Sequence, residues 1–153
     1  MSSVSNNTSV RLNALGRYAK TSSYTLVVET KSLFTVTGIV LVTGLLGYVD
    51  TAITVANTVK LQVNPTTGTT GDLCAATDIG TTDTPAGDLL GLPPLPAGSL
   101  LFGIGAVRVG ATATFAAAAG TIDQVTATGA DGAVTWHITY VPVSADGNVV
   151  AAF

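Results

Sequence analysis

The chain has 153 residues, the length of one domain or of one domain with an arm. Only 10% of its residues are charged, 47% are hydrophobic, and the net charge is −3. Because a typical soluble domain has about 25% charged residues, this composition excludes a disordered polyelectrolyte and a coiled coil, and it favours a surface that associates. The single cysteine, Cys74, excludes a disulfide within the chain.

Positive charge is concentrated near the beginning of the chain. Residues 1–31 contain four of the six basic residues, whereas residues 61–153 contain one basic residue and seven aspartates. We therefore divide the chain into a Ser/Asn-rich N-terminal arm, residues 1–22, and a body, residues 23–153. We expect the arm to dock on an acidic partner, and the alternative is a solvated terminus. The candidate docking residues are Arg11, Arg17 and Lys20.

The first part of the body is expected to form short strands. Residues 24–30 and 33–38 are rich in β-branched and aromatic side chains. The run Ile39–Val42 is apolar on both faces, as in a central strand, and Gly44 and Gly47 after it predict a bulge or bend.

The same region contains an uncharged run, residues 32–49, that is nearly long enough to span a membrane as a helix. Its threonines, glycines and β-branched residues favour strands instead. Polarity then alternates over residues 51–63, which predicts a half-buried strand that is broken near Asn57. Its core-facing residues would be Ile53, Val55, Val59, Leu61 and Val63.

Residues 78–98 are expected to form a loop, because they contain four prolines. The loop is also rich in leucine, which is unusual on the surface of a monomer. We therefore expect it to contact another subunit, and the alternative is a loop that folds over its own core. The candidate interface residues in this loop and the strand after it are Leu89, Leu90, Leu92, Leu95, Leu101 and Phe102.

The clearest strand pattern lies near the end of the chain. Trp136, Ile138 and Tyr140 share one face of a predicted strand, and His137 lies on the other. The Asp-Gly pairs at 131–132 and 146–147 suit type I′ hairpin turns. With about eight short strands and little helix, the chain is predicted to be all-β, an antiparallel β-sandwich or jelly-roll-like fold with an extended N-terminal arm.

Few residues could carry chemistry. His137 is the only imidazole, and an enzyme is the least supported class of function. The residues Asp72, Asp78, Asp83 and Asp88 recur every five or six positions, which leaves a calcium site open although they do not match an EF-hand loop. The chain has no phosphate-binding glycine motif and no basic stripe with aromatic residues, so we expect no cofactor and no nucleic-acid partner.

Three segments of the chain resemble small structural proteins of tailed bacteriophages. Those proteins pair an LFTVTG segment near the start with an aromatic strand that leads into a P-[LV]-S-x-D-G-x-V tail. Here residues 33–38 read LFTVTG and are followed by the apolar run Ile39–Val42, residues 120–122 read GTI, and residues 136–152 read WHITYVPVSADGNVVAA. The likeness covers residues 24–153 but is specific only at its two ends. It implies a virion component, a decoration or cement protein of the head, and it brings no catalytic residues.

Composition and resemblance together predict a homo-oligomer, most simply a trimer, that binds the major capsid protein on the outside of the capsid after synthesis in the host cytoplasm. A membrane is not an expected partner. Two alternatives stay open. One is a tail, neck or fibre subunit, and the other is a surface module that binds glycan through Trp136 and Tyr140.

Overall fold

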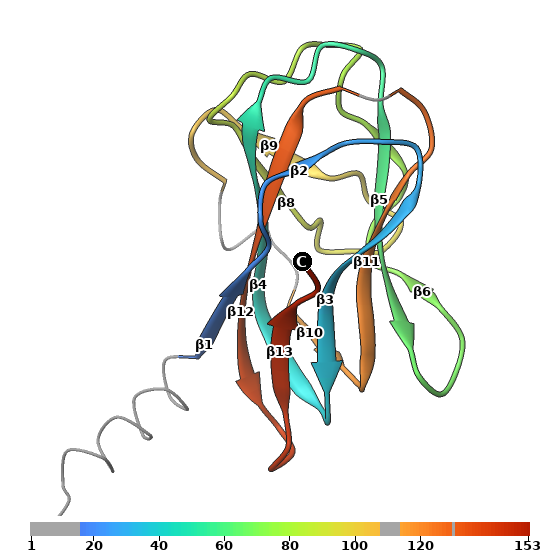
Figure 1. The fold of residues 1–153 in the computed structure, drawn as a ribbon, viewed down its shortest axis with the longest axis vertical. Helices are drawn as coiled ribbons and strands as arrows, with labels where there is room; N and C mark the ends of the chain where they lie inside the picture. The colour runs from blue at the N-terminus through green and yellow to red at the C-terminus, as the bar shows by residue number, and fades with distance from the viewer. Residues whose placement is uncertain (1–15, 108–113, 130) are drawn as a thin grey trace, which may run out of the picture.

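The computed structural model describes residues 16–107, 114–129 and 131–153, and these form two antiparallel sheets packed face to face (Figure 1). This confirms the predicted all-β sandwich. The first sheet contains β1 (Arg17–Lys20), β2 (Tyr24–Thr25), β4 (Val40–Thr51), β8 (Leu89–Gly91), β9 (Leu101–Gly103), β10 (Phe115–Ala117) and β12 (Ala133–Pro142). The second sheet contains β3 (Thr30–Thr37), β5 (Thr58–Pro65), β6 (Gly71–Asp72), β7 (Thr77–Asp78), β11 (Gly120–Thr126) and β13 (Asn148–Ala151).

The strand order brings together segments that are far apart in the chain. The first sheet follows the order β1-β12-β4-β8-β9 and the second β13-β3-β11-β5-β6. The chain changes sheets between β3 and β4, between β11 and β12, and between β12 and β13, so crossing connections close both ends of the sandwich. We call the end where β1 begins, together with the β3–β4 and β12–β13 turns, the arm end. The opposite end, which carries residues 78–88, is the loop end (Figure 1).

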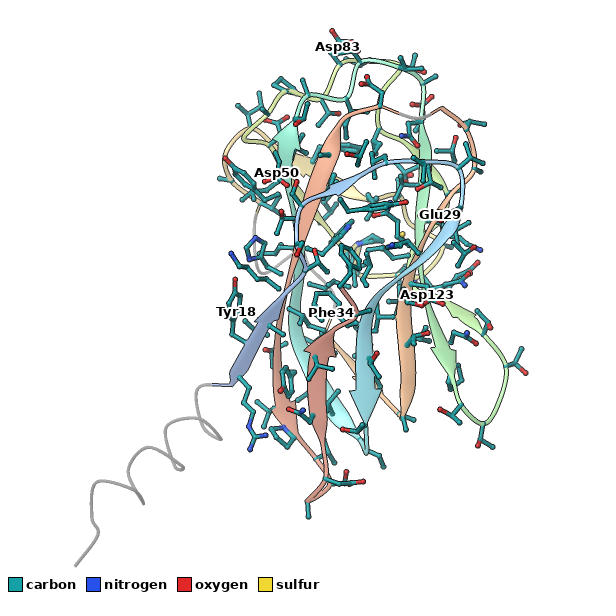
Figure 2. The ribbon with its side chains drawn as sticks, viewed as in Figure 1. Tyr18, Glu29, Phe34, Asp50, Asp83 and Asp123 are labelled. Carbon is teal, nitrogen blue, oxygen red and sulfur yellow. The ribbon has the colours of Figure 1, made fainter. Side chains whose placement is uncertain are left out.

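The core lies between the sheets, and Trp136 is one of its fully buried residues. Trp136, Ile138 and Tyr140 point inward from β12, as the sequence predicts, and Phe34 of β3 is buried between the sheets (Figure 2). Trp136 covers Gly47 of β4, where a Cβ would lie 3.1 Å from two carbons of the indole ring. Any side chain at this position would push against the indole, so glycine serves packing here. Each fully buried large apolar side chain contributes about 1.5–3 kcal/mol.

The twelve-residue strand β4 continues through both glycines that were predicted to bend it. Its pairing with β12 shifts register beside Gly44 and leaves Thr43 without a partner, which is the predicted bulge. Residues Val40–Val42 pair with β12 on one edge and β10 on the other, which confirms the predicted central strand. The run is not covered on both faces, however, because Ile39 and Leu41 are exposed. A two-layer sandwich covers each sheet on one face only, so the outward half of this run stays uncovered.

Two predicted strands are interrupted where the chain crosses between sheets. In residues 51–63, β4 ends first and β5 begins only after the predicted break at Asn57. Four of the five side chains predicted to face the core do so, but Val55 is exposed because the crossing segment has no strand periodicity. Likewise, the predicted strand 24–30 is divided: Tyr24–Thr25 forms β2 of the first sheet, and Thr30 already begins β3 of the second.

The two Asp-Gly pairs do not form type I′ turns, because neither Asp131 nor Asp146 has a positive φ. Each pair joins strands in opposite sheets, so neither closes a hairpin. Asp131 instead accepts hydrogen bonds from the Thr54 amide at 2.6 Å, the Thr54 hydroxyl at 2.8 Å and the Val55 amide at 3.1 Å. These bonds tie together two crossing segments at the loop end.

The last residues of the predicted arm form a strand. Strand β1 pairs antiparallel with β12, with Arg17 opposite Tyr140 and Lys20 opposite His137. The Thr21 amide extends this ladder by donating to the Trp136 carbonyl at 3.0 Å. The sandwich therefore includes part of the segment that was assigned to the arm, while residues 1–15 lie outside the described residues.

Candidate interaction surfaces

The structure separates the six apolar residues predicted to form an interface. Leu90 and Leu92 are fully buried in the core of their own chain, so their assignment to an interface is wrong. For these two, the alternative of a loop folded over its own core is correct. Two others are half-buried, whereas Leu95 and Phe102 are exposed, Leu95 with 68% of its surface accessible.

Of the predicted docking residues, Arg17 and Lys20 are described and Arg11 is not. Arg17 is half-buried where β1 begins at the arm end, and Lys20 is exposed at the end of the strand. Between them Tyr18 points outward from β1 (Figure 2). Its hydroxyl lies 2.8 Å from His137 Nδ1, and the two rings stack with their centroids 5.9 Å apart. Burial and the nearby Lys20 charge lower the pKa of His137, so its imidazole is neutral at pH 7 and can accept this hydrogen bond.

The aromatic residues that a glycan-binding site would need are in the core. Trp136 Nε1 donates to Gln124 Oε1 at 2.7 Å, and the Tyr140 hydroxyl donates to Asn148 Oδ1 at 2.8 Å. Both aromatic side chains are buried beneath the second sheet. The alternative of a glycan module that uses these two residues is therefore wrong, because neither ring offers a face to a sugar.

The two segments that carry the phage resemblance meet at the arm end. Ser144 Oγ accepts a hydrogen bond from the Ile39 amide at 2.7 Å and donates one to Asp146 Oδ1 at 2.6 Å. Gly38, at φ +60°, packs so closely against Ser144 and Asp146 that a Cβ would collide with both side chains. The glycine of one segment and the serine and aspartate of the other are thus parts of one structural unit, and they hold two turns together.

Exposed apolar side chains surround these turns. Ile39 is 46% and Val143 62% exposed, and the exposed Leu41 lies opposite the half-buried Val141 in the β4–β12 ladder. We call these four residues the arm-end patch. Gly16, where the described chain begins, also lies against Val141. Uncharged apolar surface therefore adjoins the point at which the basic arm enters the sandwich.

A cleft of about 740 Å³ opens at the loop end, between residues 78–88 and the end of β9. Its apolar walls include Ile79, Pro85, Phe102 and Ile104, of which Ile104 is 93% exposed. The volume falls within the range of roughly 300–1,000 Å³ that is usual for ligand sites. The cleft is thus large enough to receive several side chains of a partner.

Three aspartates line this cleft, and they differ in what holds them. The Asp78 carboxylate accepts hydrogen bonds from the Thr81 hydroxyl, from the amides of Gly80 and Thr81 at 2.9 Å, and from the Asn57 amide at 3.3 Å. These bonds, with the Thr81 hydroxyl first, lower the pKa of Asp78.

The other two acids of the cleft are Asp83 and Asp88. Asp83 is exposed at the loop end (Figure 2), while Asp88 is only 8% exposed. No described residue hydrogen-bonds to either carboxylate. Of the three acids, Asp78 is thus the one that hydrogen bonds from described residues hold in place.

Neither metal nor thiol chemistry finds support in the part of the chain that the structure describes. Within it, no group of three or more His, Cys, Asp or Glu residues could hold a metal ion, so the spacing that left a calcium site open does not produce one. Cys74 is buried and its Sγ accepts a hydrogen bond from the Leu61 amide at 3.2 Å. Burial raises the pKa of this thiol, which keeps it protonated and unreactive. The described residues also contain no helix that is long and apolar enough to cross a membrane.

Comparisons with protein-family models, curated proteins and solved structures find no match for this chain. Two surfaces stand out from the geometry alone, the arm-end patch and the loop-end cleft. The sequence does not reveal the first because apolar residues on both faces of a central strand do not show which face a second sheet covers. It missed the second because the walls of the cleft come from two segments that only the fold brings together.

Proposed function

We propose that this chain is a structural subunit of a tailed-bacteriophage virion, a decoration protein that associates with itself and binds the major capsid protein on the outside of the head. The resemblance of residues 33–38 and 136–152 to small phage structural proteins motivates the proposal. The observation that carries it is the arm-end patch, an exposed apolar surface beside the entry of a basic arm. This combination suits a partner that offers an apolar surface with acidic groups nearby.

The mechanism would be mechanical. Covering apolar surface contributes about 25 cal/mol per Å², so each 100 Å² of the patch that a capsid subunit covers contributes about 2.5 kcal/mol. Stable interfaces bury about 800 Å² on each partner. A contact of this kind, repeated over many copies, would reinforce the shell against pressure from within.

The test is binding of the purified chain to tailless heads that lack it, measured by co-sedimentation and by the temperature at which the heads rupture. We expect saturable binding and a higher rupture temperature. Val143→Asp places a charge in the arm-end patch and should weaken binding at least tenfold. The matched control is Val55→Asp, an exposed valine in the segment after β4, which should bind as the unchanged chain does.

Each outcome separates the alternatives. Binding to purified tails but not to heads would assign the chain to a tail, neck or fibre. Binding to neither structure would overturn the virion proposal. Equal loss of binding by both valine variants would reject the arm-end patch as the docking surface.

A further inference from the structure

The outer face of the first sheet is apolar along its centre. Leu46 and Tyr48 of β4 project outward, because they lie opposite His137 and Thr135, which alternate with the inward-facing residues of β12. Leu89 of β8, one of the predicted interface residues, lies beside Tyr48 in the same row, and Tyr48 is 41% exposed. An antiparallel sheet with one solvated face normally carries polar residues there, so an apolar row at the centre of the outer face indicates a contact with a partner.

Polar side chains on this face hydrogen-bond to one another. The Thr43 hydroxyl donates to the Thr139 hydroxyl at 3.0 Å, and the Tyr18 hydroxyl lies 2.8 Å from His137 Nδ1. A polar group that is already paired loses less on leaving water than an unpaired one. Covering the face therefore sacrifices few hydrogen bonds to solvent.

The outer face of the second sheet has a different character. Thr35, Thr121 and Asn64 form one row across β3, β11 and β5, and Lys60 of β5 pairs with Asp72 of β6 at 2.8 Å. Hydroxyl, amide and charged groups of this kind are suited to water. The two outer faces therefore differ, and the first is the one suited to burial.

We infer that the outer face of the first sheet packs against the same face of a second copy of this chain, in a two-fold contact. The inference deepens the self-association in the proposed function and rests on it. The sheet is four strands wide along β4, because β1 and β2 pair with β12 on one side and β8 and β10 pair with β4 on the other. Four strands at about 4.8 Å and the twelve residues of β4 at about 3.3 Å give a flat area of roughly 760 Å². Stable interfaces bury about 800 Å² on each partner, so the face has the size that a dimer needs.

Charged residues flank this face and favour a second copy as the partner. Lys20 of β1 lies opposite His137, and Asp50 lies near the end of β4. Two strand spacings and four residues separate them by roughly 16 Å. In a two-fold contact each residue meets its counterpart reciprocally, so Lys20 of each copy can approach Asp50 of the other. Two complementary charge pairs would then border an apolar centre, as in other protein interfaces.

The fold limits the extent of the contact. A Cβ at Gly103 of β9 would collide with the Ala106 carbonyl, so residues after β9 already cover that strand and the open face ends beside β8. At the other end the face includes Leu41 and Val141 of the arm-end patch. The contact leaves the two residues of that patch that lie outside the strands to a capsid subunit.

The experiment is sedimentation velocity of the full chain over a range of concentrations, with circular dichroism to show that each variant is folded. Tyr48→Asp places a charge at the centre of the contact and should weaken dimerisation at least tenfold. Tyr48→Phe keeps the ring and should dimerise within about threefold of the unchanged chain. The matched control is Val150→Asp, since Val150 is 49% exposed on the second sheet and this variant should dimerise normally.

A second measurement needs no variant. In NMR spectra of the unchanged chain, the methyl signals of Leu46 and Leu89 should shift on dilution as the dimer dissociates, whereas those of Val150 should not. Signals of Leu46 and Leu89 that stay constant while the dimer dissociates would place the contact elsewhere and overturn the inference.

Other outcomes are also decisive. A monodisperse monomer at all concentrations, a smallest oligomer of three as composition and resemblance predict, or equal weakening by Tyr48→Asp and Val150→Asp would overturn the two-fold contact. A monomer whose Tyr48→Asp variant no longer binds heads would assign the face to the capsid protein instead. Monomers that bind heads with Tyr48→Asp unaffected would contradict only the dimer, while dimers that bind no virion part would contradict only the virion role.

Discussion

The two ends of this sandwich differ in charge and in how they are held together. At the arm end, two turns lock through Gly38, Ser144 and Asp146 and leave apolar side chains uncovered around them. The loop end is acidic and its crossing segments are tied by carboxylates, such as Asp78 and Asp131, that accept several hydrogen bonds each. The arm end is thus held by closely packed turns, and the loop end by carboxylates that accept hydrogen bonds from backbone amides.

This difference shows why low charge in the composition does not mean a uniformly apolar surface. The aspartates are placed where loops need acceptors for amide groups, because a carboxylate satisfies backbone donors that a turn leaves free. Among the described residues, Asp78 and Asp131 show this most clearly, because each accepts hydrogen bonds from two or more backbone amides.

The largest change should come from the core that both ends share. Trp136→Ala removes a fully buried indole and its hydrogen bond to Gln124, and we expect a loss of about 3–5 kcal/mol in the free energy of unfolding. Urea denaturation followed by circular dichroism measures it. Thr139→Ala, on the outward face of the same strand, removes only an exposed hydrogen bond from the Thr43 hydroxyl at 3.0 Å and should cost no more than about 1 kcal/mol. Similar values for the two variants would contradict the assignment of Trp136 to the core.

Each end of the sandwich contains a glycine with positive φ, so the two ends can be compared directly. Gly38→Ala strains the backbone by about 1–2 kcal/mol and pushes apart the Ser144–Ile39 hydrogen bond, worth about 1 kcal/mol. Gly87→Ala at the loop end, where φ is +97° and nothing lies within 4 Å, should cost the backbone strain alone. Thermal unfolding of both variants measures the difference. An equal cost at the two ends would show that the arm-end turns are not closely packed.

Much of the fold follows from the sequence, and the departures have physical causes. The inward face of β12 is predicted correctly, because its large aromatic and apolar side chains alternate with polar ones and only one face of the strand can then point into the core. The break near Asn57 and the bulge near Gly44 also follow from local residue types. In contrast, the expected burial of Val55 and Leu41 is not observed. A period-two pattern does not reveal where a strand leaves its sheet or which face a second sheet covers.

The interaction surfaces were harder to predict. Leucines in a proline-rich loop are equally suited to an interface and to a core, and only the fold distinguishes Leu90 from Leu95. The contact between Gly38 and Asp146 spans more than one hundred residues. Nothing local in either segment indicates that the two meet, although both segments are part of the resemblance to phage structural proteins.

A smaller effect should appear at the loop end when the pH is lowered, as a loss of stability. Because the pKa of Asp78 is lowered by its hydrogen bonds, the stability it contributes is present above the ordinary aspartate pKa near 4 and is lost as pH falls below it. Asp78→Asn should lower the Tm at pH 7 and flatten its decline between pH 5 and pH 3. Asp72→Asn, which removes an exposed ion pair with Lys60, should change little. A wild-type decline that Asp78→Asn leaves unaltered would contradict this role.

The smallest expected effect concerns the strand that joins the arm to the sandwich. Tyr18→Phe removes the hydroxyl that bonds to His137 Nδ1 and should cost about 0.5 kcal/mol, since the contact is exposed. The lowered pKa of His137 means that its contribution to stability is present above about pH 6.5 and is lost as pH falls through the pKa of the folded state. Protonation would then weaken the hold of β1 at acidic pH.

Titration of the His137 ring protons by NMR tests the cause of this shift. Lys20 lies near His137, and its charge disfavours the imidazolium, so Lys20→Gln should raise the pKa of His137 toward its ordinary value without restoring it fully. Burial, the larger cause, remains in the variant. The control is Lys60→Gln on the second sheet, which should leave the titration unchanged. If Lys20→Gln also leaves it unchanged, the charge of β1 does not act on the imidazole, and burial with the opposing charge of Asp50 sets the pKa of His137.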